Sequence, residues 1–210
     1  MIFRMAISKE QHDQLTPSFA LKELKEGNQR FVDGRPSSVL NTQLMEQTKD
    51  GQYPKAIVVS CIDSRVPVEQ IFDQHIGDIF VARVAGNFVN EDILASIEYA
   101  CVVAGSPLVV VLGHEGCGAI KSACDDVRFG HITKMLKAIS PAVEDAKQTE
   151  SEPFNSSNPS FVSSVTQSNV LLNIQKIIHE SESLNELNSK GKIAICGGIY
   201  SINNGIVNWL

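Results

Sequence analysis

Two polar stretches, each placed directly after an apolar run, constrain this chain most. Residues 56–59 (Ala-Ile-Val-Val) precede Cys-Ile-Asp-Ser-Arg at 61–65, and residues 108–112 (Leu-Val-Val-Val-Leu) precede His-Glu-Gly-Cys at 114–117. Bounded runs of this length, rich in Val and Ile, are typical of strands buried on both faces of a parallel sheet. Both polar stretches are therefore expected just past the carboxyl ends of strands, the edge of an open α/β sheet where ligands bind.

The rest of the pattern alternates between helices and strands. Further strands are predicted over residues 79–82 and 192–196, the second closed by Gly197 and Gly198. Helices are predicted over residues 17–33, 39–50, 67–74, 91–104, 116–125, 131–147 and 161–187, with an irregular segment over 1–15 and a polar loop over 149–160. Asn203-Asn204 between two apolar segments indicates a hairpin and an antiparallel C-terminal edge strand. This order predicts an α/β fold with a mostly parallel central sheet flanked by helices.

We expect residues 1–210 to form a single α/β domain, with residues 1–50 as an N-terminal helical arm. Thr16 and Pro17 are typical of a helix start, and Gly34 is placed to end that helix. The apolar stripe of this first helix is thin. Either it packs on its own domain, or it packs on a partner subunit.

Composition excludes several classes of partner. The net charge of −6 and the lack of a basic cluster argue against nucleic-acid binding, and no apolar run approaches the roughly 18–20 residues of a membrane span. Residues 1–5 lack the apolar core of a secretory signal. Five cysteines, an odd number without a dense framework, fit a reducing cytoplasm better than a disulfide scaffold.

Two thiols, an imidazole and a carboxylate expected at one sheet edge indicate a metal site. Cys61 and Asp63 are two residues apart, and His114 and Cys117 are three apart, so each pair can reach one ion from a single turn. Thiolate and imidazole ligands favour zinc over magnesium or calcium, which prefer oxygen.

Each residue also has a simpler interpretation. A cysteine after a strand is commonly a small buried apolar side chain, and Asp63 with Arg65 can be a surface ion pair. Gly113, Gly116 and Gly118 could instead cradle a phosphate, but their spacing is not G-x-G-x-x-G and no Lys-Ser/Thr follows Gly118 directly. Zinc is favoured because both polar stretches are expected at the same edge of one sheet.

Four motifs, in this order, bear on the function. They are Cys-x-Asp-Ser-Arg-Val from Cys61, Arg-x-x-x-Asn from Arg83, Glu-Tyr-Ala from Glu98 and Gly-His-x-x-Cys-Gly from Gly113. Together they resemble the motifs of β-class carbonic anhydrases. The similarity extends from residues 24–31 to the final hairpin, which is nearly the whole chain.

The resemblance implies a carbonate dehydratase, a lyase with one Zn²⁺ per chain. It would reversibly hydrate carbon dioxide to bicarbonate and a proton by attack of zinc-bound hydroxide. The ligands would be Cys61, His114 and Cys117, with water in the fourth position or, in a closed form, Asp63. As catalytic residues, Arg65 would keep Asp63 ionised and turned away from the metal, and Asp63 would orient the nucleophile.

The resemblance also implies a substrate pocket made of Gln52, Phe80, Tyr99 and the backbone N–H of Gly118; the simpler interpretation of these residues is core packing. Gln52 would reach the site from a neighbouring subunit, so we expect a homo-oligomer, either a dimer or a dimer of dimers, with the N-terminal arm on the partner.

Two aspects of the resemblance are incomplete. Members of the family with an inhibitory bicarbonate site have a tryptophan where this chain has Val58, although Val66, Arg83 and Tyr200 stand at matching places. No proton shuttle is evident among the other histidines, which are His12, His75, His131 and His179.

Two alternatives remain open at this point. The same zinc site could hydrolyse carbon disulfide or carbonyl sulfide, or the chain could be a non-catalytic, zinc-stabilised binding protein. The pair of Asp63 and Arg65 argues against the second alternative, because a purely structural zinc site needs neither residue.

Overall fold

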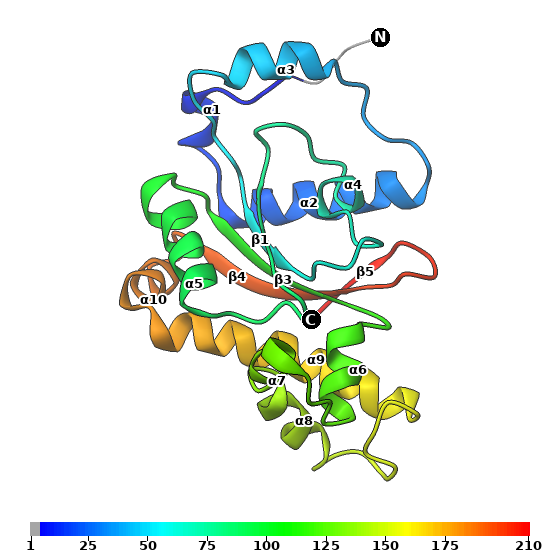
Figure 1. Cartoon of the computed structure of the whole chain (residues 1–210). Coiled ribbons are helices and arrows are strands. Elements are labelled where there is room, and N and C mark those ends of the chain that lie inside the picture. The colour runs from blue at the N-terminus through cyan, green and yellow to red at the C-terminus, as the bar shows by residue number, and fades with distance from the viewer. Residues whose placement is uncertain (1–4) are drawn as a thin grey trace.

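The computed structural model describes residues 5–210, which form helices around one five-stranded sheet (Figure 1). The strands are β1 (Ile57–Ser60), β2 (Phe80–Arg83), β3 (Leu108–His114), β4 (Ala194–Tyr200) and β5 (Val207–Trp209). Their order is β2-β1-β3-β4-β5; β1 to β4 are parallel, and β5 pairs antiparallel with β4. The predicted α/β fold with an antiparallel C-terminal edge strand is confirmed.

Helices cover both faces of the sheet. In chain order they are α1 (Lys9–His12), α2 (Pro17–Val32), α3 (Asn41–Thr48), α4 (Val68–Ile71), α5 (Glu91–Glu98), the π-helix η1 (Tyr99–Val103), α6 (Gly118–Cys124), α7 (Gly130–Leu136), α8 (Ser140–Ala146), α9 (Pro159–Glu180) and α10 (Glu182–Ser189). In Figure 1, α2 and α4 lie on one side of the sheet, and α5, α9 and α10 lie on the other. Within residues 5–210, no helix combines the length and apolar character needed to cross a membrane.

The central strand β3 is buried along its whole length and separates two apolar clusters. Leu108, Val110 and Leu112 pack on the side of α2 and α4, whereas Val109 and Val111 pack on the side of α5 and α9. A strand covered on both faces has no polar side, which explains its unbroken apolar run. β3 extends two residues further than predicted, so His114 is the last residue of the strand rather than a residue of the following loop.

Residues 5–15 contain a short helix where an irregular segment was predicted. Ser8 caps α1 by accepting a hydrogen bond from the Gln11 N–H, and the Gln11 side chain accepts one from the Ser8 N–H. This reciprocal capping box stabilises a helix too short to persist alone. The predicted irregular segment over 1–15 and the predicted lack of a secretory signal in residues 1–5 also concern residues 1–4, which lie outside the described residues.

Two predicted helices are each broken into two. In place of one helix over 161–187, α9 ends at Glu180 and Ser181 caps α10, its hydroxyl accepting a hydrogen bond from the Leu184 N–H. In place of one helix over 131–147, α7 ends at Leu136 and α8 starts at Ser140 with Pro141 in its first turn. Proline lacks an N–H and disfavours a helical residue before it, so it starts helices rather than continuing them.

The predicted helix over 91–104 begins as expected at Asn90, whose side chain accepts a hydrogen bond from the Ile93 N–H. After Glu98, however, the chain widens into the π-helix η1, which the sequence pattern did not predict.

The prediction that Gly197 and Gly198 close the fourth strand is wrong, because β4 continues through both to Tyr200. A Cβ atom at Gly197 would lie 2.6 Å from a methyl group of Val170 on α9, and one at Gly198 would lie 2.8 Å from a methyl group of Val207 on β5. The glycines therefore serve close packing inside the strand rather than its termination.

Helix α2 packs on the sheet of its own chain, the first of the two possibilities raised by its thin apolar stripe. Ala20 and Leu24 are fully buried beside β3. Asn28 donates hydrogen bonds to the carbonyl oxygens of Ile71 and Gly205 and accepts one from the Val207 N–H. Packing of residues 1–50 on a partner, and the assignment of one domain, stay predictions.

Candidate metal centre

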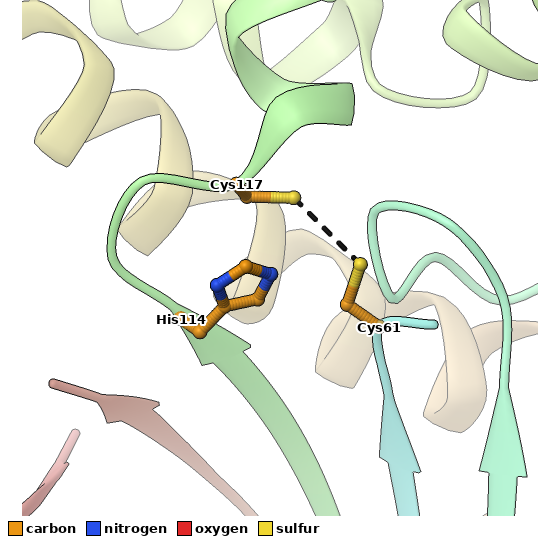
Figure 2. Close-up of side chains that lie close together, drawn as sticks. All are labelled: Cys61, His114 and Cys117. Atoms are coloured by element: carbon orange, nitrogen blue, oxygen red, sulfur yellow. Dashed lines mark hydrogen bonds between the residues drawn. The ribbon is translucent and has the colours of Figure 1, made fainter. Parts of the chain in front are cut away.

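Three side chains converge at the carboxyl-terminal edge of the sheet. Cys61 directly follows β1, His114 ends β3, and Cys117 caps the start of α6 (Figure 2). Because β1 and β3 are adjacent parallel strands, with Ser60 beside Leu112, their ends reach the same place. The two Sγ atoms and one imidazole nitrogen all lie within 4.8 Å of one another, and all three residues are buried.

The spacing of the sulfurs suits a metal ion. The Sγ atoms of Cys61 and Cys117 are 3.9 Å apart. Two thiolates at about 2.3 Å from a tetrahedral zinc ion would lie about 3.8 Å apart. At this spacing the two sulfurs could share one metal ion.

The ring of His114 is oriented for coordination. Its Nδ1 atom lies 2.9 Å from the carbonyl oxygen of Glu115, so Nδ1 carries the proton and Nε2 keeps its lone pair. Nε2 is buried and has no hydrogen-bond partner among the described residues. A buried polar atom without a partner is costly, and a metal ion would satisfy it.

The two thiols differ in their electrostatic environment. The hydrogen bond from Cys117 lowers the pKa of the Cys61 thiol, and the Gly86 N–H, 3.3 Å from Cys61 Sγ, adds a second donor. The same contact with Cys61, together with burial, raises the pKa of the Cys117 thiol. The contact between the two sulfurs thus favours the thiolate form at Cys61, which is the form that binds zinc.

Asp63 is held by Arg65 beside the cluster. The Arg65 side chain donates through Nε to Oδ1 at 2.9 Å and through a terminal nitrogen to Oδ2 at 2.7 Å, and its backbone N–H also donates to Oδ1. These hydrogen bonds hold the pKa of Asp63 well below its usual range. Oδ2 of Asp63 lies 3.9 Å from Nε2 of His114, so the carboxylate lies next to the cluster.

Sequence reasoning missed the residues that fix the two loops. Arg83, at the end of β2, donates to the carbonyl oxygens of Cys61 and Asp63 at 2.8 and 2.7 Å. On the other side, the Glu115 carboxylate accepts hydrogen bonds from Ser201 and Asn203 in the C-terminal hairpin. Arg83 lies in a motif that the sequence showed, but nothing in the sequence pairs Glu115 with that hairpin.

The predicted substrate residues divide into two groups. Gly118 begins α6 immediately after Cys117, so its backbone lies beside the cluster. Phe80 and Tyr99 contact each other edge to face, with ring centroids 6.2 Å apart, and line a cavity of about 540 Å³ along β2. Gln52 lines another cavity, at the amino-terminal edge of the sheet.

Gln52 and Phe80 are therefore remote from the cluster of their own chain. Gln52 precedes β1 and Phe80 begins β2, whereas Cys61 follows the last residue of β1. A four-residue strand separates the two edges by roughly 10–13 Å. Within one chain, the structure brings together the three predicted ligands, Asp63 and the backbone of Gly118. Gln52 and Phe80 lie at the other edge of the sheet, and the prediction that Gln52 serves a neighbouring subunit stays a prediction.

Comparison with known proteins gives consistent results. Residues 56–207, well over half of the chain, match the family model described as "Carbonic anhydrase". The chain is 35% identical over 201 residues to carbonic anhydrase 2 of Mycobacterium tuberculosis, covering 90% of each protein. It is 42% identical over 133 residues to a carbonic anhydrase of Mycolicibacterium smegmatis, covering 60% of this chain and 65% of that protein.

Solved structures show the same fold. The structure of the β-carbonic anhydrase CcaA matches with a TM-score of 0.70 and 28% identity, covering 89% of this chain and 93% of that one. One of two β-carbonic anhydrases of Sordaria macrospora, described as tetrameric, matches with a TM-score of 0.70 and 23% identity, covering 92% and 95%.

Proposed function

The chain belongs to the β-class carbonic anhydrases, enzymes that reversibly hydrate carbon dioxide to bicarbonate and a proton, and on this premise we propose that Cys61, His114 and Cys117 hold one zinc ion per chain. The observation that carries this assignment is the orphaned Nε2 atom of His114, which is buried next to two sulfurs at tetrahedral spacing. Sulfur and imidazole ligands together favour zinc over cations that prefer oxygen.

Asp63 and Arg65 are proposed to direct the attack on carbon dioxide. When bound, zinc acts as a Lewis acid that makes water acidic enough to supply hydroxide near neutral pH. The ionised Asp63, which has no proton to donate, accepts a hydrogen bond from the nucleophile and so orients its lone pair. Arg65 keeps Asp63 ionised, and the two hydrogen bonds of its guanidinium restrict the carboxylate to one orientation.

The backbone N–H of Gly118 is proposed to donate a hydrogen bond to the bicarbonate product. Two features support this: Gly118 follows Cys117 directly, and the added Cβ of a larger residue there would meet no atom within 4 Å. The space above this backbone is therefore open to a small anion.

We further propose that Gln52, Phe80 and Tyr99 complete the site of a partner subunit in a homodimer or a dimer of dimers. All three are remote from the end of β1 that holds Cys61. β2 is an edge strand, so the backbone groups of its outer side are available to another chain. Next to it, Tyr99 and Val103 are 56% and 70% exposed, an unusual position for large apolar side chains of a closed monomer.

A cytoplasmic location is proposed from the five free cysteines, which form no disulfide and suit a reducing compartment. Hydrolysis of carbon disulfide or carbonyl sulfide, and a non-catalytic binding role, are not favoured by the family assignment.

The direct test is stopped-flow hydration of carbon dioxide at pH 7 and pH 8.5 by protein whose zinc content has been measured. We expect one zinc per chain and activity at both pH values. Activity at pH 8.5 alone would indicate that Asp63 occupies the fourth ligand position at neutral pH. One zinc per chain without activity at either pH would refute the proposed roles.

A further inference from the structure

A cavity of about 630 Å³ opens at the amino-terminal edge of the sheet, opposite the metal cluster. Its walls come from α1 and from the segments that precede β1, β3 and β4. The residues that line it include Lys9, His12, Gln52, Tyr53, Gly105 and Lys192. The cavity thus contains Gln52, the residue proposed to serve the partner's active site, together with a histidine to which no role has been assigned.

His12 is buried in this wall and contacts two neighbouring residues. It is 7% exposed, and its ring centroid lies 5.9 Å from that of Tyr53. Its Nε2 atom lies 3.2 Å from the carbonyl oxygen of Pro54. A carbonyl only accepts, so Nε2 carries the proton in the neutral ring and Nδ1 keeps a lone pair. Within residues 5–210, no side chain or backbone group hydrogen-bonds to that Nδ1.

Gly105 makes room for this ring. Its φ is +78°, and an added Cβ atom would lie 3.3 Å from Cε1 of His12 and 4.0 Å from Nδ1. The side of the His12 ring that carries the Nδ1 lone pair therefore faces Gly105. Glycine has no side chain, so it leaves space next to this side of the ring. Packing here preserves access to Nδ1 instead of filling it.

The cavity that contains His12 is close to the cavity along β2 that Phe80 and Tyr99 line. Tyr99 begins η1 and lines the cavity along β2 together with Phe80. Val103 ends η1 and lines the cavity that contains His12. A single five-residue turn thus connects the two spaces. If Gln52, Phe80 and Tyr99 face a partner's metal centre, the cavity of His12 opens beside the same centre.

Carbon dioxide hydration needs a proton acceptor, since each turnover releases one proton. Histidine is the side chain whose ordinary pKa best suits that task near neutrality. His114 is a predicted ligand, His75 lies 3.7 Å from the buried Asp73, and His131 and His179 are exposed on α7 and α9. Of the five histidines, all of which are described, only His12 lines the cavity that contains Gln52.

We propose that His12 transfers the proton of the partner subunit's active site to solvent, an inference that rests on the function proposed above. Water in the site gives up a proton, which reaches Nδ1 and converts the ring to imidazolium. The imidazolium then releases the proton to buffer in the cavity and returns to the neutral ring. The charged and titratable groups that line the cavity together with His12 are those of Lys9, Asp13, Tyr53 and Lys192, and Lys9 is already paired with Asp13 at 2.6 Å.

The test separates proton transfer from the conversion of carbon dioxide. His12→Gln keeps a donor for the Pro54 carbonyl but removes the titratable base, and His131→Gln removes an exposed histidine as the control. Zinc content and thermal stability are measured for both, and the wild type is assayed first, since an inactive wild type refutes the proposed function and this proposal with it. In weak buffer we expect kcat of His12→Gln to fall about tenfold or more, with kcat/KM unchanged.

Imidazole in the buffer should restore kcat of His12→Gln towards the wild-type value, while His131→Gln should match the wild type throughout. An unchanged kcat would overturn the proposal. So would a joint fall of kcat and kcat/KM that imidazole does not relieve, because that pattern indicates a structural role.

Hybrid dimers locate the path of the proton. A dimer of one His12→Gln subunit and one Asp63→Ala subunit has a single competent site, which faces the intact His12 of the other subunit. We expect wild-type kcat per competent site in weak buffer. A reduced kcat in this hybrid would show that His12 serves its own chain and would refute transfer across the interface.

Discussion

The main-chain N–H of Gly86 lies 3.3 Å from Sγ of Cys61 and donates a hydrogen bond to it. Gly86 has a φ of +84°, and its carbonyl oxygen accepts a hydrogen bond from Asn169 on α9. The conformation that directs this N–H at the sulfur is thus one that only glycine adopts readily, and a helix on the far side of the loop fixes it. Cys61, the proposed metal ligand, and the N–H that donates to it are thus positioned by different elements.

Gly86→Ala is expected to weaken zinc binding about 10- to 100-fold, the usual cost of disturbing a group that supports a ligand. An added Cβ would lie 2.6 Å from a methyl group of Ile139, so the loop must shift away from Cys61. Competition with a zinc chelator measures the affinity. Gly34→Ala is the control, because its φ of +64° imposes similar strain with no atom within 4 Å. An equal loss in both variants would contradict the role of the Gly86 N–H.

Cys117→Ala should remove zinc and lower stability, because two ligands do not hold an ion as three do. Loss of about 3 kcal/mol of binding energy would lower the Tm by roughly 6–12 °C. Zinc per chain and thermal unfolding measure both effects. Cys124→Ala removes a buried thiol of the same apolar cluster, and it should keep zinc while losing only packing energy. If the two variants bind zinc equally, Cys117 is not a ligand.

Asp63→Ala should retain zinc but lose about 100-fold or more of kcat/KM for carbon dioxide, the usual size of a general acid–base contribution. Its matched control is Asp126→Ala, which breaks an exposed ion pair of the same spacing, with Arg128 at 2.8 Å, and should leave the rate unchanged. An Asp63→Ala enzyme with full zinc and near wild-type turnover would show that the carboxylate does not orient the nucleophile.

Asp73→Asn should destabilise the protein in a pH-dependent way. Burial alone would raise the pKa of Asp73, but hydrogen bonds from Ser37 and Arg30 outweigh it and lower the pKa. A lowered folded-state pKa stabilises the protein above the unfolded value of about 3.9, and this stability is lost as the pH falls through the folded-state pKa.

At pH 7 we therefore expect Asp73→Asn to cost about 1–3 kcal/mol in urea unfolding at fixed protein concentration. The difference should shrink steadily below pH 4. Asparagine tolerates the φ of +48° at this position, so backbone strain does not confuse the comparison. A loss that stays constant down to pH 3 would mean that the ionised form of Asp73 is not what stabilises the fold.

The sequence predicted the elements whose signals are local. Asn90 and Thr16 cap the helices they were expected to cap, and the apolar run at 108–112 forms the buried central strand. It did not predict that Ser181 would end one helix and begin another. A serine hydroxyl can cap a helix or point to solvent in its middle, and the choice depends on tertiary neighbours such as Glu98, which accepts its hydrogen bond.

The candidate site divides in the same way. Cys61, His114 and Cys117 were predicted together because parallel strands bring their carboxyl ends to one edge. Gly86, Glu115 and Ser201 were not, because their contacts join segments that are remote in sequence. The burial of His12 was equally unpredictable, since it depends on how α1 meets the turn before β3.

The hydrogen bond from Ser201 to Glu115 has a consequence for biosynthesis. Ser201 lies 86 residues after Glu115, so the loop that carries the proposed ligands is synthesised long before the hairpin that fixes it. Until the hairpin is made, we expect the thiols of Cys61 and Cys117 to lie on an incomplete sheet, where oxidants and other metals can reach them. We expect zinc to be acquired stably only near completion of the chain. A chain whose translation stops before the hairpin should therefore not retain zinc.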